Sequence, residues 1–156
     1  IDLKPLKLIK KSDFMKSFNL NLVSAAEIIK CLANNLKQNK GSIVLFSTVA
    51  VKQGFPNHAI VSSAKGAVEG LTLALAAEFA PNIRVNCIAP SLTKSKISEF
   101  LLKNEKMAES IAKMHPMKRL GEGSDSSSIA KFLLSEESSW VTGQIIGVDG
   151  GRSSVA

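Results

Sequence analysis

The sequence contains no tyrosine, and it is poor in other aromatic residues, in histidine and in cysteine. Aromatic residues make up 5% of the 156 residues, and there are two histidines and two cysteines. Cys31 and Cys87 lack the spacing of metal ligands, and His58 and His115 are too far apart to suggest a zinc site, so no metal is expected. Two isolated cysteines are typical of free thiols in a reducing cytoplasm, where we expect this chain to act.

A signal peptide, an internal repeat and a long apolar run are also missing from the sequence, so we expect no membrane partner. The net charge is +7, from 20 basic and 13 acidic residues. The basic residues are dispersed lysines without interleaved aromatic side chains, which favours solvated helix faces over a nucleic-acid surface. Attraction of phosphate groups in a nucleotide site is the other interpretation of this charge.

The sequence does contain an alternation of amphipathic and continuously apolar segments, which we expect to form one domain over 1–156. After a loop at 1–12, one helix or two abutting helices are predicted over 13–38, and further helices over 58–80 and 125–134. A loop and helical segment is predicted over 92–114, and strands over 42–47, 83–89 and 144–148. Asp13 is the predicted cap of the first helix, and Ser124 or Asp125 that of the last. This order predicts an α/β fold with a parallel sheet and right-handed crossovers, in which strand 42–47 is buried on both faces.

The predicted helix 58–80 is the centre of this pattern. Its apolar positions recur every three or four residues, at Ile60, Ala64, Ala67, Val68, Leu71, Leu75 and Phe79. Lys65 lies within a run of small residues in its first turns, and lysine is rarely buried without a partner or a function. A lysine that extends along the helix surface to reach solvent is the simpler interpretation from spacing alone.

Three segments resemble, in the same order, the later segments of the short-chain dehydrogenase/reductase family. They are AKGAVEGLTLALAAEFA (64–80), IRVNCIAPSLT (83–93) and WVTGQIIGVDGG (140–151), and the resemblance extends from about residue 1 to residue 151. It implies a Rossmann-like, doubly wound parallel sheet and an oxidoreductase that uses NAD or NADP. The family's Gly-rich dinucleotide turn has no counterpart here. The resemblance therefore implies an incomplete sheet without its first four strands, whether in a fragment, a proteolysed product or a shortened gene.

Catalysis in this family uses a tyrosine as general acid/base, a lysine four residues later, a serine and an asparagine. The resemblance assigns the lysine to Lys65, the asparagine to Asn21 and the serine hydroxyl to Thr48. Val61 occupies the tyrosine position and cannot exchange a proton, although general acid/base catalysis contributes a factor on the order of 10²–10⁴. His58, one turn earlier, is a candidate replacement, and a histidine at a helix start with no catalytic role is the simpler alternative.

The loop that contacts the nicotinamide in the family matches Pro90–Ser95, with Ser91 in place of a glycine. The implied cofactor-binding residues are Lys65, Pro90, Ser91, Leu92, Thr93 and Ser95, with a polar loop after a strand as the alternative. The family also pairs the helices that match 13–38 and 58–80 across a subunit interface. We therefore expect a homo-oligomer, either a dimer or a tetramer.

The function implied is that of an NAD(P)-dependent oxidoreductase acting on a small molecule. Val61 and the missing Gly-rich turn predict that this chain is not active by itself. A non-catalytic member that binds a cofactor or a partner, and a structural remnant without a ligand, are the alternatives. The segment 92–114, which matches the family's substrate loop, has no residue that identifies the substrate.

Overall fold

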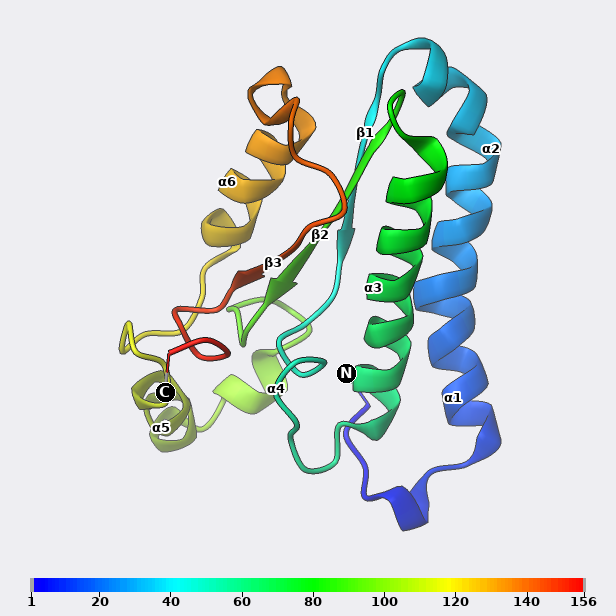
Figure 1. Cartoon of the computed structure of the whole chain (residues 1–156). Helices are drawn as coiled ribbons and strands as arrows, with labels where there is room; N and C mark the ends of the chain where they lie inside the picture. Colours follow the sequence, from blue (N-terminus) through cyan, green and yellow to red (C-terminus); the bar gives the residue numbers. More distant parts are fainter. Residues whose placement is uncertain (1, 156) are drawn as a thin grey trace.

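The computed structural model describes residues 2–155 and shows a parallel three-stranded β-sheet between helices (Figure 1). The strands are β1 (Ser42–Phe46), β2 (Arg84–Pro90) and β3 (Ile145–Val148), in the order β1-β2-β3. The register sets Ile43 opposite Val85 and Cys87 opposite Ile145. The predicted α/β fold with a parallel sheet is therefore confirmed.

The helices form a layer on each face of the sheet (Figure 1). On one face α3 (Ala59–Phe79) lies beside a long rod made of α1 (Lys11–Phe18), a π-helical turn (Asn19–Val23) and α2 (Ser24–Gln38). On the other face lies α6 (Gly123–Leu134). The short helices α4 (Glu99–Leu102) and α5 (Glu105–Lys113) lie near the carboxyl ends of the strands, and single 3₁₀ turns occur at Leu6–Leu8 and Glu136–Ser138.

Two helices begin two residues before their predicted starts, because their capping aspartates act from the third helical position. The Asp13 carboxylate accepts the Lys10 backbone N–H at 3.0 Å, so α1 begins at Lys11. In α6 the Asp125 carboxylate accepts the Glu122 backbone N–H at 2.8 Å. This reach back to the N-cap is the second half of a capping box. The sequence thus identified two capping residues and misplaced them by one helical turn.

The predicted helical segment 92–114 is divided into two helices by an internal cap. α4 ends at Leu102, and the Asn104 side chain then accepts the Met107 backbone N–H at 3.1 Å. An asparagine at an N-cap satisfies a donor that would otherwise lack a partner, so it starts a new helix rather than continuing the old one.

The buried stripe of α3 follows a strict four-residue spacing. It consists of Ile60, Ala64, Val68, Thr72 and Ala76, whereas the predicted Leu71, Leu75 and Phe79 are only partly buried. By length and composition alone α3 could cross a membrane, so the expectation that no apolar run is long enough is wrong for this helix. Its packing partners are β2 and the neighbouring helical rod, and 28% of its most apolar window is buried within the described residues.

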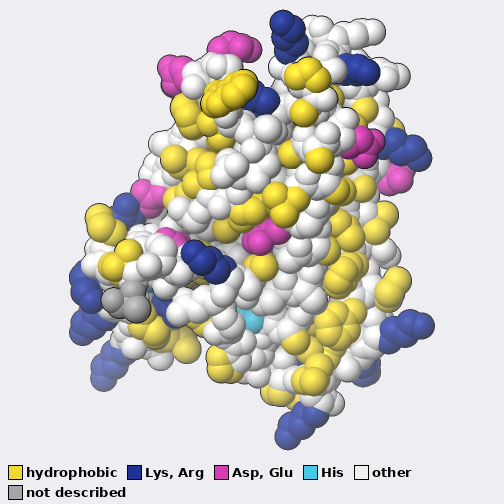
Figure 2. Space-filling view, in the orientation of Figure 1, with side chains coloured by type: hydrophobic (Ala, Val, Ile, Leu, Met, Phe, Trp, Pro, Cys, Tyr) yellow, Lys and Arg dark blue, Asp and Glu magenta, His cyan; other side chains and the backbone are white. Residues whose placement is uncertain are grey.

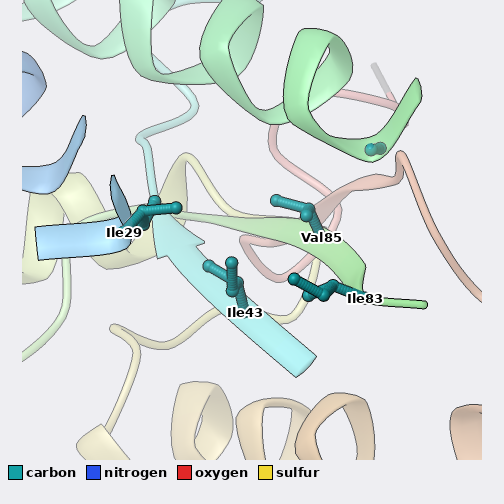
Figure 3. Close-up of a cluster of buried hydrophobic side chains, with 5 residues drawn as sticks. Ile29, Ile43, Ile83 and Val85 are labelled. Carbon is teal, nitrogen blue, oxygen red and sulfur yellow. The ribbon is translucent and has the colours of Figure 1, made fainter. Parts of the chain in front are cut away.

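The core between α2, α3 and the sheet contains Ile29, Ile43, Ala76, Ile83 and Val85 (Figure 3). Strand β1 contributes less to burial than the sequence predicts, because it lies at an edge of the sheet. Phe46 at its end is 44% exposed. Figure 2 shows apolar side chains on the outer face of the helices, and Ile28, Leu32 and Leu73 are among the exposed ones.

Two polar side chains of β2 connect the sheet to segments far along the chain. The Arg84 guanidinium donates to the Leu133 and Ser135 carbonyls at 2.8 and 3.0 Å, at the carboxyl end of α6. The fully buried Asn86 amide donates to the Val141 carbonyl and accepts the Gln144 N–H, at 2.9 and 3.0 Å. A cation at a helix carboxyl end and a fully paired buried amide are both stabilising.

Candidate functional site

A cavity of about 440 Å³ opens at the carboxyl ends of the strands. Its walls are the segments that follow β1 and β2, the first turns of α3 and part of α5. Ligands of open α/β sheets bind at this end of the strands. The predicted site residues that line it are Thr48, Val61, Lys65, Pro90, Ser91, Leu92, Thr93 and Ser95.

Lys65 lies half-buried in the wall of this cavity, one turn after Val61 on α3. Its ammonium group donates to the Phe46 carbonyl at 2.9 Å, at the last residue of β1. Burial lowers the pKa of Lys65 from its usual value of 10.5, since the charged form loses contact with water. Lys65 is therefore a half-buried lysine with a defined partner rather than one that extends freely into solvent.

Val61 and Thr48 line the same cavity as Lys65. Val61 therefore presents two methyl groups where the family resemblance implies a phenol. The Thr48 hydroxyl accepts the Ala50 N–H at 3.3 Å and carries a proton of its own that could be donated to a ligand. The structure thus brings these three predicted residues to one surface, and Lys65 is the titratable one among them.

Asn21 is not among the residues that line the cavity. It lies in the π-helical turn between α1 and α2, and its side-chain amide donates to the Ser17 carbonyl at 2.9 Å. Single π-turns within helices occur frequently at functional sites, because they release backbone groups from the regular hydrogen-bond ladder. No sequence pattern indicated this π-turn, since the residue types over 13–38 fit one helix or two abutting helices.

His58 lies at the mouth of the cavity, immediately before α3. Its Nδ1 is 2.8 Å from the Pro56 carbonyl, and its ring centroid is 5.3 Å from that of Phe55. A carbonyl only accepts hydrogen bonds, so Nδ1 carries the proton and Nε2 is left as an acceptor. This arrangement keeps His58 available as the candidate replacement for the missing phenol.

The loop 90–95 is held in place by hydrogen bonds from three directions. The Ser91 N–H donates to the Val148 carbonyl of β3 at 3.2 Å. The Ser98 hydroxyl donates to the Thr93 carbonyl at 2.6 Å and accepts the Ser95 N–H at 3.0 Å. These contacts give the loop a defined shape before any ligand binds.

His115 is a site residue that sequence reasoning missed. It is 2% exposed, and its Nε2 lies 2.8 Å from the Ser91 hydroxyl, while Nδ1 lies 2.9 Å from the Ile111 carbonyl. Since 24 residues separate Ser91 from His115, no local pattern could have indicated the contact.

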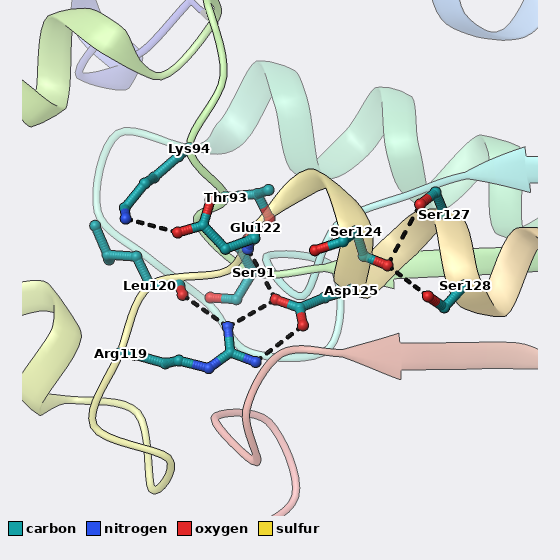
Figure 4. Close-up of polar contacts among 10 residues, drawn as sticks. All are labelled: Ser91, Thr93, Lys94, Arg119, Leu120, Glu122, Ser124, Asp125, Ser127 and Ser128. Carbon is teal, nitrogen blue, oxygen red and sulfur yellow. Dashed lines mark hydrogen bonds and ion pairs between the residues drawn. The ribbon is translucent and has the colours of Figure 1, made fainter.

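A second cavity of about 610 Å³ lies between β3 and the amino-terminal half of α6. Ser91 borders both cavities, and His115 borders this second cavity. Its main polar feature is a bidentate ion pair in which the Arg119 guanidinium donates to the two Asp125 oxygens at 2.7 and 2.9 Å (Figure 4). Arg119 and the Glu122 N–H together hold the pKa of Asp125 far below its usual value. This pair fixes the start of α6 against the turn that precedes it.

Comparison with known proteins identifies the family. A family model described as enoyl-(acyl carrier protein) reductase matches residues 3–153. The chain is 37% identical over 141 residues to dehydrogenase/reductase SDR family member 4 of Homo sapiens, covering 89% of this chain and 51% of that protein. It is also 37% identical over 150 residues to a tropinone reductase homolog of Arabidopsis thaliana, and the match covers 95% of this chain and 57% of that protein.

Solved structures agree with these sequence matches. A gluconate 5-dehydrogenase from Burkholderia cenocepacia in complex with NADP and tartrate superposes with a TM-score of 0.92 and 26% identity, covering 99% of this chain and 61% of that one. A 4-hydroxyisoleucine dehydrogenase mutant complexed with NADH and succinate superposes with a TM-score of 0.90 and 27% identity, and the match covers 97% of this chain and 63% of that one.

The fold and the sequence matches together define the class of protein: a Rossmann-type α/β protein with its ligand cavity at the carboxyl ends of the strands. The chain belongs to the short-chain dehydrogenase/reductase family, whose members are NAD(P)-dependent oxidoreductases. The chain spans about half the length of the curated relatives that it matches.

Proposed function

We propose that this chain is the substrate-side half of an NAD(P)-dependent oxidoreductase, and that Val61 prevents it from catalysing hydride transfer. One observation carries the proposal: Val61 lines the same cavity as Lys65 and Thr48, at the position where the family resemblance implies the acid/base tyrosine. Loss of an acid/base group removes a factor on the order of 10²–10⁴ in rate.

The remaining residues fit the nicotinamide side of a dinucleotide. Lys65 offers an ammonium group to the ribose, and the loop 90–95 offers hydroxyl and backbone groups in a fixed shape. The Thr48 hydroxyl is positioned to hold a substrate carbonyl. When bound, the cofactor supplies the hydride. Val61 leaves the oxygen of that carbonyl without a proton donor, so the reduction stops at this step.

The first test is turnover by the purified chain. We expect no oxidation of NADH or NADPH above buffer with an enoyl thioester, a cyclic ketone or a keto sugar acid, the substrate types suggested by the names of its relatives. Oxidation that increases in proportion to protein concentration would overturn the proposal.

A second test separates the effect of Val61 from the effect of the part of its relatives that this chain does not span. The chain is fused behind the amino-terminal half of a relative, and Val61→Tyr is compared with Val61→Phe in that fusion. We expect turnover only with the tyrosine, because phenylalanine supplies the ring without an ionisable hydroxyl. Equal rates for the two variants would show that another group, such as His58, donates the proton.

A family member that binds a ligand without catalysis is the second candidate, and the retained cavity with its ordered loop favours it. Titration of the 156-residue chain with NADPH distinguishes the two, because an oxidoreductase that offers only the contacts of the nicotinamide side should bind NADPH weakly. Binding at micromolar or tighter affinity without turnover would favour the binding protein. We place either form in the cytoplasm, with both cysteines as free thiols.

A further inference from the structure

We propose that Arg152, which lies over the Phe55 ring with His58 beside that ring (the three are called here the Arg152 wall), binds the carboxylate of a small substrate whose apolar body fills the rest of the cavity. The inference rests on the proposed function, because it assigns a substrate class to the same cavity. Its central residue, Arg152, lies near the carboxyl end of the chain and was not singled out by the sequence patterns.

The charge of the cavity favours an anion. Two of the side chains that line it are cationic, namely Lys65 and Arg152, and none of the lining residues is an aspartate or a glutamate. Lys65 is already engaged by the Phe46 carbonyl, on the side of α3 that faces β1. Lys65 is also the residue proposed to meet the cofactor ribose, so Arg152 is the permanent charge that is left for a substrate group.

The Arg152 guanidinium has hydrogen-bond donors to spare. Its carbon lies 5.0 Å from the centroid of the Phe55 ring, and its hydrogen-bond acceptor within residues 2–155 is the weakly accepting Met114 sulfur at 3.5 Å. None of the ion pairs formed within those residues includes Arg152. A guanidinium stacked on an aromatic ring keeps its planar edge free for a bidentate contact with a carboxylate.

The acidic group closest along the chain, Asp149, is engaged elsewhere. Its carboxylate accepts hydrogen bonds from the Gly151 N–H at 2.9 Å and from the backbone and hydroxyl of Ser153 at 2.9 and 2.5 Å. Burial alone would raise the pKa of Asp149, but these hydrogen bonds outweigh it and lower the pKa. Asp149 thus stays ionised and orders the turn that carries Arg152 instead of neutralising it.

The wall is also held in shape before a ligand arrives. Arg152 donates its backbone N–H to the Asp149 carbonyl at 3.2 Å, and Gly151, with φ of 86°, lies so close to Pro116 that a Cβ there would be 3.1 Å from the ring. Phe55 also contacts the His58 ring, with the two ring centroids 5.3 Å apart. An anchor that needs no reordering on binding loses little affinity to conformational entropy.

The remainder of the cavity lining is largely apolar. It includes Leu3, Val61, Leu92, Ile97, Leu101 and Ile111. This composition fits a ligand with one charged end and a hydrocarbon or cyclic body, and it fits a sugar phosphate poorly. The geometry thus favours an apolar carboxylic acid over a phosphate group of the cofactor.

The test compares two ligands that differ only in charge, hexanoate and hexanamide, by calorimetric titration of the whole chain. We expect hexanoate to bind about tenfold more tightly, because charge-assisted hydrogen bonds are about twice as strong as neutral ones. Arg152→Gln should abolish this preference, and Arg152→Lys should retain part of it. The matched control is Lys131→Gln, which removes the same charge from the exposed face of α6 and should leave the preference intact.

Thermal unfolding of each variant checks that Arg152→Gln remains folded. Equal binding of hexanoate and hexanamide by the unmodified chain, or an unchanged preference in a folded Arg152→Gln, would overturn the inference. Parallel titrations with inorganic phosphate and nicotinamide mononucleotide test whether Arg152 binds a phosphate group of the cofactor instead. If Arg152→Gln weakens the binding of these two ligands and not that of hexanoate, the guanidinium serves the cofactor and the inference fails. None of these titrations measures turnover, so they test the preference for hexanoate independently of the hydride-transfer proposal.

Discussion

The Ser91 hydroxyl oxygen lies 2.8 Å from Nε2 of His115, and this contact joins the loop after β2 to the turn after α5. Nδ1 of His115 faces the Ile111 carbonyl at 2.9 Å, so it carries the ring proton, and Nε2 accepts from Ser91. The family resemblance implies a glycine at position 91, which has no hydroxyl to donate. The serine therefore adds an anchor to the loop that is expected to face the nicotinamide.

Removing this anchor should destabilise the protein. We expect Ser91→Ala to lower the free energy of unfolding by about 1–3 kcal/mol, because it leaves the buried His115 Nε2 without a donor. Ser128→Ala is the control, since the Ser128 hydroxyl borders the second cavity but bonds only within α6. Urea unfolding measures both variants. If Ser91→Ala lowers the free energy of unfolding no more than Ser128→Ala does, a water molecule has taken the place of the Ser91 hydroxyl.

The two cysteines should differ sharply in reactivity. Cys31 is exposed, whereas Cys87 is fully buried in β2, and burial raises the pKa of the Cys87 thiol to about 11. A disulfide reagent should therefore modify one thiol of the native chain rapidly and the second only after unfolding. Cys31→Ser should remove the fast phase. A fast phase that survives this substitution would show that β2 opens readily.

The same thiol predicts a loss of stability in alkaline solution. Between pH 9 and pH 11 the unfolded chain releases the Cys87 proton while the folded chain retains it, so stability falls as pH rises through this range. The full difference amounts to about 2–3 kcal/mol. Cys87→Ala should make the decline shallower by a similar amount. Unfolding midpoints of both proteins across this pH range test the prediction. If the midpoints decline with pH at equal slopes, the raised pKa does not belong to Cys87.

At the acid end, the Arg119–Asp125 ion pair should set part of the pH dependence. The pKa of Asp125 is lowered in the folded chain, so its contribution to stability is fully present above its unfolded pKa of 3.8 and is lost as pH falls below that value. We expect Asp125→Asn to be less stable at neutral pH and less sensitive to acid. Melting temperatures from pH 6 down to pH 2 measure this, and parallel curves for the two proteins would be the contrary result.

The exposed apolar residues of α2 and α3 support the proposal that the chain forms a homo-oligomer through these helices. Ile28 and Leu32, one turn apart on α2, are 60% and 49% exposed. We expect the unmodified chain to elute at least as a dimer, and Ile28→Glu with Leu32→Glu to dissociate it by placing charges in the interface. Asn34→Glu, exposed on another face of α2, is the control. Light scattering that reports a well-dispersed monomer for the unmodified chain would contradict the proposal.

The sequence predicted the elements of the fold well and the connections between them poorly. Apolar periodicity located all three strands and the long helices, because it reports the burial of each segment by itself. Contacts such as Ser91 with His115, or Asn86 with Gln144, depend on how distant segments approach each other, and no local pattern contains that information.

The residues of the candidate site likewise separate into those that local sequence patterns identified and those that they missed. Motifs placed Thr48, Val61 and Lys65, which the structure gathers in one cavity, since each follows a strand or lies on α3. Arg152 was missed because a single arginine in a terminal turn carries no periodic signal. Asn21 was placed from its motif without the π-turn that surrounds it, because a π-turn changes the hydrogen-bond pattern and not the residue types.

The sequential strand order β1-β2-β3 has a consequence for how the chain folds. Of the two strand pairings, the one between β1 and β2 spans the shorter crossover, through α3, and so closes at the lower entropic penalty. We expect this βαβ unit to form the folding nucleus, with α6 and β3 docking afterwards. Val85→Ala should then mainly slow refolding, whereas Leu133→Ala in α6 should mainly accelerate unfolding.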